Sequence, residues 1–181
     1  MKTNPKHTPP HLFLDNTPYF ITAAIYKKRP LLKDPATKNQ LLDLIQTTLQ
    51  TYQWTLDHWV ILDNHYHWLG LSHQGRDLSK IIHTIHTQSG YYIRQKTNCA
   101  KPVWWNYWDY CPRHDKDYQI RLNYLLNNPV KHGYVDNLHD YPFSSFHTIF
   151  AKSGQKALAW QFRQYPEYKT LVLREAYDDD F

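Results

Sequence analysis

The sequence predicts an α+β sandwich, in which helices cover one face of an antiparallel sheet and the elements follow in the order β-α-β-β-α-β-α. Two patterns predict this fold. Runs of strand-forming residues alternate with runs whose apolar residues recur at helical spacing. Two of the strand-like runs are separated only by Asp63 and Asn64, as in a hairpin. At 181 residues, the chain suits one domain with trailing segments.

The first strand and the first helix have clear boundaries. Residues Tyr19–Tyr26 are rich in strand formers and end at the basic run Lys27-Lys28-Arg29. Asp34 then offers a helix N-cap, with Pro35 at the first helical position. The helix that follows is amphipathic, with apolar side chains at Leu41, Leu42, Ile45, Leu49 and Tyr52.

The hairpin should join the strands Trp54–Leu62 and His65–Leu71, because both residues between them tolerate the left-handed backbone that a two-residue turn demands. From Asp77 onward the apolar residues return to helical spacing. They predict a second helix with one continuous stripe, made of Leu78, Ile81, Ile82, Ile85, Ser89, Tyr92 and Ile93.

Residues 102–113 contain the aromatic stretch Trp104-Trp105-Asn106-Tyr107-Trp108, which we interpret as a fourth strand with at least one tryptophan in the core. Asp115 can cap a third helix. That helix should end near Asn128, because Pro129 disfavours helical geometry in the residue before it.

The remainder of the chain carries weaker signals. Beyond Gly133 we expect loops and a short helix from about Ala157. The acidic end Asp178-Asp179-Asp180 is expected to be mobile.

Composition narrows the class of protein. The formal charge of +5 favours a polyanionic partner, and 15 Tyr with 7 Trp suit base stacking as well as a core. Cys99 and Cys111 form no disulfide framework. No signal sequence or membrane-length apolar run is present, so we expect a soluble cytoplasmic protein associated with the nucleoid.

His65 and His67 are the first candidates for a functional site. On a strand they project from the same face, which lets two imidazole nitrogens converge on one metal ion. The pair alone is a weak signal in a chain with 12 His, where both residues could simply be polar positions on a strand.

The third helix supplies further candidates. Its apolar stripe contains Tyr118, Leu122, Leu125 and Leu126. A polar set lies away from that stripe and should face away from the core: Asp117, Arg121, Tyr124 and Asn128. An ordinary surface tyrosine and a helix-ending asparagine would give the same pattern.

Taken together, these side chains specify a reaction. His65, His67 and the Asn128 carbonyl oxygen give mixed nitrogen and oxygen ligation for a divalent metal, Mg²⁺ or Mn²⁺, with positions left open for water or phosphate. Tyr124 could then attack phosphorus, form a 5′-phosphotyrosine and release a 3′-hydroxyl. The sequence does not identify the base that removes the phenol proton.

The chain resembles the single-tyrosine HUH transposases, in particular the REP-associated tyrosine transposases, over about Tyr19 to Phe150. Three blocks carry the resemblance in order: the strand Leu62–Leu69 with its Asn-His-x-His core, the Tyr124–Val135 block with Asn128-Pro129-Val130, and Tyr141-Pro142-Phe143-Ser144-Ser145-Phe146. Two departures stand out. Asp63 replaces the usual proline, and bulky Tyr66 fills the position between the histidines.

The resemblance implies that His65, His67 and Asn128 are metal ligands and that Tyr124 is the nucleophile. It implies an RRM-like sheet with a catalytic C-terminal helix and single-stranded DNA hairpins as substrates. We accordingly expect a flexible N-terminal arm over 1–17, a catalytic domain over 18–150 and a C-terminal extension over 151–181. A monomer or a homodimer would be compatible, because in related enzymes the tyrosine helix can serve its own chain or a partner.

DNA-contacting residues are less clearly marked. Candidate phosphate contacts, which could equally form a solvated basic face, are Lys27, Lys28, Arg29, Arg94, Lys96 and Lys101. Candidate stacking residues are Trp104, Trp105 and Trp108.

Two other functions use the same features: a replication or mobilisation nickase, and a non-catalytic RRM-like nucleic-acid-binding protein. A zinc site using Cys99 or Cys111 fits no standard spacing.

Overall fold

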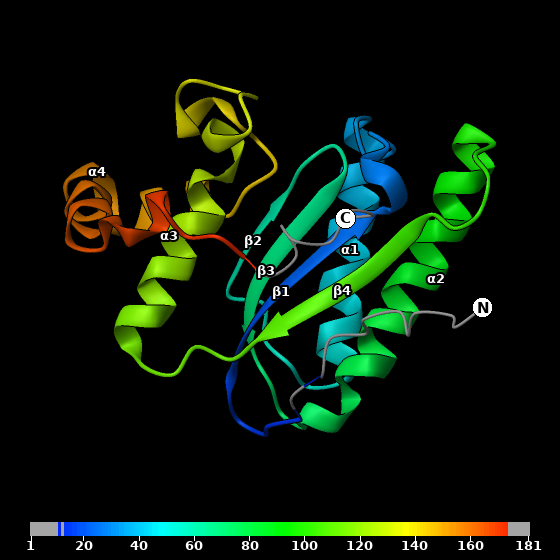
Figure 1. Ribbon diagram of the computed structural model, residues 1–181, viewed down its shortest axis with the longest axis horizontal. Helices are drawn as coiled ribbons and strands as arrows, with labels where there is room; N and C mark the ends of the chain where they lie inside the picture. The colour runs from blue at the N-terminus through cyan, green and yellow to red at the C-terminus, as the bar shows by residue number, and fades with distance from the viewer. Residues whose placement is uncertain (1–10, 12, 174–181) are drawn as a thin grey trace, which may run out of the picture.

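Four antiparallel strands form one sheet in the order β2-β3-β1-β4 in the computed structural model, which describes residue 11 and residues 13–173 (Figure 1). The strands are β1 (Pro18–Ile25), β2 (His58–Ile61), β3 (His65–Leu71) and β4 (Trp104–Tyr110). β1 pairs with both β3 and β4, and β2 pairs with β3. The predicted α+β fold with a β-α-β-β-α-β order is confirmed.

The helices lie on both sides of this sheet (Figure 1). They are α1 (Pro35–Thr51), α2 (Leu78–Thr97), α3 (Asp115–Lys131) and α4 (Phe146–Gln164), with short 3-10 turns η1 (Tyr26–Lys28), η2 (Gly75–Asp77), η3 (Leu138–Asp140) and η4 (Pro166–Lys169). α1 and α2 cover one face, and α3 crosses the other. No helix in the described part of the chain combines the length and apolar composition needed to cross a bilayer.

Alternation along the strands divides the core into two clusters. Ile21 and Trp68 point toward α1 and α2, whereas Phe20, Val60 and Leu69 point toward α3 and α4. Both faces of the sheet are therefore buried, and side chains on the α3 face can meet residues of α3.

The helix starts follow capping chemistry. The Asp34 carboxylate accepts a hydrogen bond from the Thr37 backbone N–H at 2.8 Å, and Pro35 follows at the first helical position, as predicted. α3 differs from the prediction, because His114 is its N-cap and accepts from the Asp117 N–H at 3.2 Å. Asp115 is the first helical residue instead.

The hairpin is present, but its turn has another geometry. The Leu62 N–H donates to the His65 carbonyl at 2.9 Å, which closes the predicted two-residue turn. Neither Asp63 nor Asn64 has a positive φ, so the expectation of left-handed turn residues is wrong. β2 is also shorter than expected: the N–H groups of Thr55 and Asp57 donate to carbonyls of β3, but both residues precede the strand.

α3 continues through Pro129, so the prediction that it ends near Asn128 is wrong. Proline lacks an N–H and therefore removes one helical hydrogen bond. The next turn still closes, because the N–H of His132 donates to the Asn128 carbonyl at 3.0 Å and that of Tyr134 to the Pro129 carbonyl at 2.9 Å. This extra turn places Lys131 two turns after Tyr124 on the same helical face.

The region after Gly133 holds more helix than predicted. α4 begins at Phe146 rather than near Ala157, and Gly154, with φ 76° and ψ 167°, breaks it into two sections. The expected domain boundary at residue 150 falls within this helix. Residues 13–17 belong to the expected arm and are hydrogen-bonded to the segment 72–75. Residues 1–10, 12 and 174–181, including the acidic end, lie outside the described residues.

Asp63, the residue that replaces the usual proline, is tied to its surroundings. Its carboxylate pairs at 2.6 Å with the Lys38 ammonium, whose side chain is 5% exposed and which also donates to the Tyr141 hydroxyl at 3.2 Å. The Asp63 backbone N–H, which a proline would lack, donates to the Tyr134 hydroxyl at 3.3 Å. The turn that precedes the histidine strand is thus fixed by a largely buried ion pair.

We predict that Asp63→Ala lowers the free energy of unfolding by about 3 kcal/mol, because it leaves the Lys38 ammonium buried without its counter-charge. Urea denaturation measures the change. Glu167→Ala is the matched control, since the side chains of Glu167 and its partner Lys116 are 44% and 57% exposed, and it should cost less than about 1 kcal/mol. Equal losses in the two variants would contradict a special role for the Asp63 pair.

Candidate active site

Strand pairing brings the two histidines to the face of the sheet that α3 covers. In the β1–β3 register, His67 lies opposite Thr22 and His65 opposite Ala24. The two imidazole ring centroids are 5.1 Å apart. The predicted projection of both histidines from one face is therefore present in the structure.

His67 is held from behind and has one nitrogen unused. Its Nδ1 lies 2.8 Å from the Thr22 hydroxyl, and the Phe20 ring stacks on it at a centroid distance of 5.4 Å. Its Nε2 is buried and has no hydrogen-bond partner among the described residues. Burial lowers the pKa of His67 well below its usual value, so the neutral imidazole can present a nitrogen lone pair.

His65 faces two oxygen atoms. Its Nδ1 is 2.7 Å from Asn64 Oδ1, and its Nε2 is 3.1 Å from Asn128 Oδ1. Burial lowers the pKa of His65 to about 3, so the neutral ring carries one proton for these two acceptors. With Nδ1–H donated to Asn64, the Nε2 lone pair and the Asn128 oxygen face each other, an arrangement that suits a cation.

The polar face of α3 is buried, which corrects the expectation that it faces away from the core. Tyr124 is 6% exposed and Asn128 is fully buried. The Arg121 guanidinium lies 3.3 Å above the Tyr110 ring on β4, and burying its planar surface in this way lets a charged side chain pack against the sheet. α3 lies between the sheet and α4 with η4, so both of its faces are covered.

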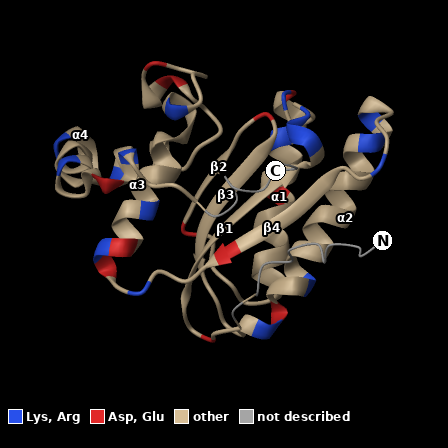
Figure 2. Cartoon of the chain, viewed as in Figure 1, with Lys and Arg blue, Asp and Glu red and all other residues tan. Residues whose placement is uncertain are grey.

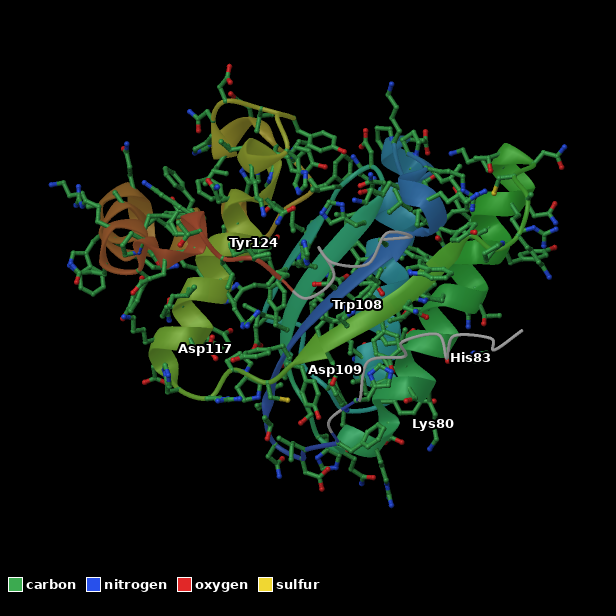
Figure 3. The ribbon with its side chains drawn as sticks, viewed as in Figure 1. Lys80, His83, Trp108, Asp109, Asp117 and Tyr124 are labelled. Atoms are coloured by element: carbon green, nitrogen blue, oxygen red, sulfur yellow. The ribbon has the colours of Figure 1, made fainter. Side chains whose placement is uncertain are left out.

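Tyr124 lies on α3 beside the sheet, and its ring centroid is 5.6 Å from that of His67 (Figure 3). The Lys131 ammonium donates to its hydroxyl at 3.0 Å and also lies 4.3 Å from the ring centroid. The phenol oxygen is therefore oriented by a cation within the same chain, close to both histidines.

These groups line a cavity of about 370 Å³. His132 borders it, with a ring centroid 5.0 Å from that of His65, and burial lowers its pKa. Lys28, Tyr134 and the segment 171–173 complete much of the wall. The cavity therefore combines imidazole, phenol and ammonium groups at one end of the sheet.

The side chains fit a divalent metal. Within the described residues no group of three or more His, Cys, Asp or Glu is placed to hold one, so the ligand set would have to include an amide, as His65, His67 and Asn128 do. The buried, unpartnered Nε2 of His67 is a ready donor. For the same reason, no cysteine–histidine zinc cluster is present among these residues.

The candidate phosphate contacts fall into different environments. Lys28 lines the cavity, and Lys27 is exposed beside it. Arg29 instead donates to the carbonyls of Ala100 and Pro102, which ties the end of β1 to the segment before β4. Arg29 therefore has a structural role, and a DNA contact stays a prediction for all three residues.

The residues near the end of α2 also differ. Lys96 pairs with Asp34 at 2.6 Å. Arg94 and Lys101 lie beside Trp104, which is buried, as expected of at least one tryptophan. Trp105 and Trp108 are half-buried.

Sequence reasoning missed Thr22, Lys131 and His132. Lys131 could have been found had the helix been extended past Pro129, since it follows Tyr124 by seven residues. Thr22 could not, because its contact with His67 depends on strand register.

Comparison with known proteins agrees with this geometry. The family model for IS200-like transposases matches residues 15–114, which include both histidines and end before α3. The chain belongs to the IS200-like transposase family.

Relatives and a solved structure are more specific. A REP-associated tyrosine transposase of Escherichia coli strain K12 is 33% identical over 106 residues, which cover 58% of this chain and 61% of that protein's length. A putative REP-associated tyrosine transposase of Haemophilus influenzae is 29% identical over 147 residues, covering 71% of this chain and 82% of that protein. The structure of a REP-associated tyrosine transposase bound to a REP hairpin superimposes with a TM-score of 0.69 at 26% identity, covering 81% and 87% of the two chains. The resemblance to REP-associated tyrosine transposases is thus confirmed.

Tyr66, the bulky residue between the histidines, packs on the opposite face. Its hydroxyl lies 3.0 Å from His86 Nε2, and the His86 ring stacks on Trp104 at a centroid distance of 4.5 Å. Burial lowers the pKa of His86 to about 3. The neutral His86 therefore supports, from behind, the strand that carries His65 and His67.

We predict that this histidine makes stability depend on pH. Between the unfolded pKa near 6.5 and about 3, the unfolded chain binds a proton that native His86 does not, so stability falls as pH falls. His86→Gln should reduce that slope by up to about 1.4 kcal/mol per pH unit. Urea denaturation in chelator at pH 7.5, 6 and 5 measures it, with His83→Gln on the exposed side of α2 as the control. An unchanged slope in His86→Gln would show that His86 titrates normally.

Proposed function

We propose that this protein cleaves and rejoins single-stranded hairpin DNA through a 5′-phosphotyrosine intermediate, acting on REP-like repeats. One observation carries the proposal: the Tyr124 phenol and the two histidines line one cavity of a single chain, and the Asn128 oxygen lies 3.1 Å from His65. The similarity to a REP-associated tyrosine transposase bound to a REP hairpin supports hairpin DNA as the substrate.

The reaction would begin with attack of the Tyr124 oxygen on the scissile phosphorus. The new bond joins tyrosine to the 5′ side of the break, and the bond to the 3′ oxygen breaks to leave a 3′-hydroxyl. The covalent link preserves the phosphodiester energy. A 3′-hydroxyl from another strand can therefore attack the same phosphorus and release the tyrosine.

Lys131 would assist the nucleophile. Its ammonium, 3.0 Å from the phenol oxygen, orients that oxygen and stabilises the negative charge that the tyrosine carries as its proton leaves. The same cation is placed to attract the phosphate that enters the cavity. Its position in the extra turn after Pro129 makes the continuous α3 helix part of the proposed site.

His65, His67 and Asn128 are the residues that would hold a divalent metal, Mg²⁺ or Mn²⁺. When bound, the ion would polarise a phosphate oxygen and stabilise the charge of the transition state. Thr22 would orient His67, because a hydroxyl bonded to one ring nitrogen directs the other toward the site.

Two other functions would use the fold differently. A non-catalytic binding protein would need no phenol beside an unpartnered imidazole, and the REP-associated relatives favour palindromic repeats over the origins that a replication or mobilisation nickase cuts. The proximity of Tyr124 and His67 within one chain supports action as a monomer.

We predict that Tyr124→Phe abolishes the covalent adduct while hairpin binding persists, because the substitution removes only the attacking oxygen. Labelled hairpin DNA incubated with protein and Mg²⁺ or Mn²⁺, followed by denaturing gel electrophoresis, detects the adduct. Tyr134→Phe is the control, since this tyrosine lines the same cavity and should still form it. An undiminished adduct in Tyr124→Phe would remove this residue from the mechanism.

We also predict that chelation, or His67→Ala, stops cleavage and that Thr22→Val weakens Mn²⁺ binding about tenfold. Electron paramagnetic resonance titration of Mn²⁺ measures affinity independently of catalysis. Thr22→Ser keeps the hydroxyl and should bind like the wild type. Full cleavage in excess chelator would exclude a metal from the reaction.

A further inference from the structure

A second hollow of about 360 Å³ lies between α2 and the segment that leads into β4. Gly90, Tyr91 and Arg94 border it on α2, and Lys101 and Trp104 border it opposite. We refer to it as the α2 pocket. It lies on the sheet face opposite the Tyr124 cavity, and it shares no lining residue with that cavity.

Gly90 leaves the floor of the α2 pocket open without a structural need. It lies inside α2, is buried and has no positive φ. A methyl group at this position would meet Trp104 at 3.6 Å and Val103 at 3.7 Å, which are ordinary contacts. Glycine within a helix is less stable than alanine by about 1 kcal/mol. The glycine that keeps the floor of the pocket open therefore lowers the stability of α2.

The lining chemistry suits a nucleotide. Tyr91 is 64% exposed, and Arg94 follows it by three residues on the same helical face. The Nε of Arg94 is buried and has no hydrogen-bond partner among the described residues, while Lys101 is exposed. No described acidic residue borders the pocket. An aromatic ring beside two cations can stack on a base and bind its phosphate.

A basic segment connects this pocket to the Tyr124 cavity. Lys and Arg gather at one end of the sheet, in η1 and near the C-terminal end of α2 (Figure 2). Lys28 of η1 lines the cavity, and the Tyr26 N–H donates to the Val103 carbonyl at 2.8 Å. Arg29 fixes the adjoining wall through the carbonyls of Ala100 and Pro102. A strand leaving the cavity would thus pass positive charge on its way to the pocket.

We propose that the α2 pocket binds one nucleotide of the single-stranded flank of the DNA whose scissile phosphate occupies the Tyr124 cavity. The base stacks on Tyr91, and the phosphate binds Arg94 and Lys101. This inference rests on the proposed function for its substrate. The pocket makes the flank, as well as the hairpin, a determinant of affinity.

The test uses hairpin DNA with single-stranded flanks of increasing length, and fluorescence anisotropy measures the Kd. For the wild type, the Kd should fall in one step of about tenfold, relative to shorter flanks, once the flank is long enough to reach the pocket. Tyr91→Ala and Arg94→Gln should each abolish this step. Lys80→Gln, at the other end of α2, is the control and should keep it (Figure 3). Gly90→Ala should raise the melting temperature and yet weaken binding of the long substrates.

The outcomes separate the two proposals. Adduct formation on the shortest substrate should be equal in the wild type and all these variants. If the variants bind every length as the wild type does, the pocket does not hold the flank, whatever the adduct assay gives. If they lose affinity equally for all lengths, the assignment to the flank is wrong. A wild type that forms no adduct defeats the proposed reaction but leaves the length dependence to decide the pocket.

Discussion

The contact between His65 on β3 and Asn128 on α3 is the constraint on which the site depends. It brings a strand from the middle of the chain next to the helix that follows the sheet, where Asn128 is fully buried. The hairpin fixes the strand, and the packing of α3 against the sheet fixes the helix. If either moved by a few ångströms, the phenol of Tyr124 would no longer lie beside His67.

The support for this contact extends well beyond the cavity. Asp63 and Lys38 fix the turn before His65, and Tyr66 with His86 supports the strand from the opposite face. Both residues that depart from the family pattern therefore have partners in this chain. Both residues thus help to hold the strand from which the two histidines project.

Much of this arrangement could be predicted from local patterns. Alternation along a strand requires His65 and His67 to share a face, and helical spacing requires Tyr124 and Asn128 to lie on neighbouring turns. The docking of α3 could not be predicted, because a polar face with an arginine suggests solvent unless the Arg121–Tyr110 stack is known. The extra turn after Pro129 could not be predicted either. The hydrogen bond that proline removes is offset by those of the His132 and Tyr134 N–H groups, which depend on the conformation of the chain after the helix.

The unpartnered atoms at the site argue that this geometry is maintained for a ligand. His67 Nε2 and Asn128 Nδ2 are buried without hydrogen bonds among the described residues, and such groups each cost roughly 1–3 kcal/mol. A fold of modest stability keeps such groups only where they are compensated or used. Apolar residues at these positions would serve a purely structural sheet better. A cation shared by two imidazoles and an amide oxygen would give the His67 nitrogen its partner, and it would do so next to a phenol already oriented by Lys131.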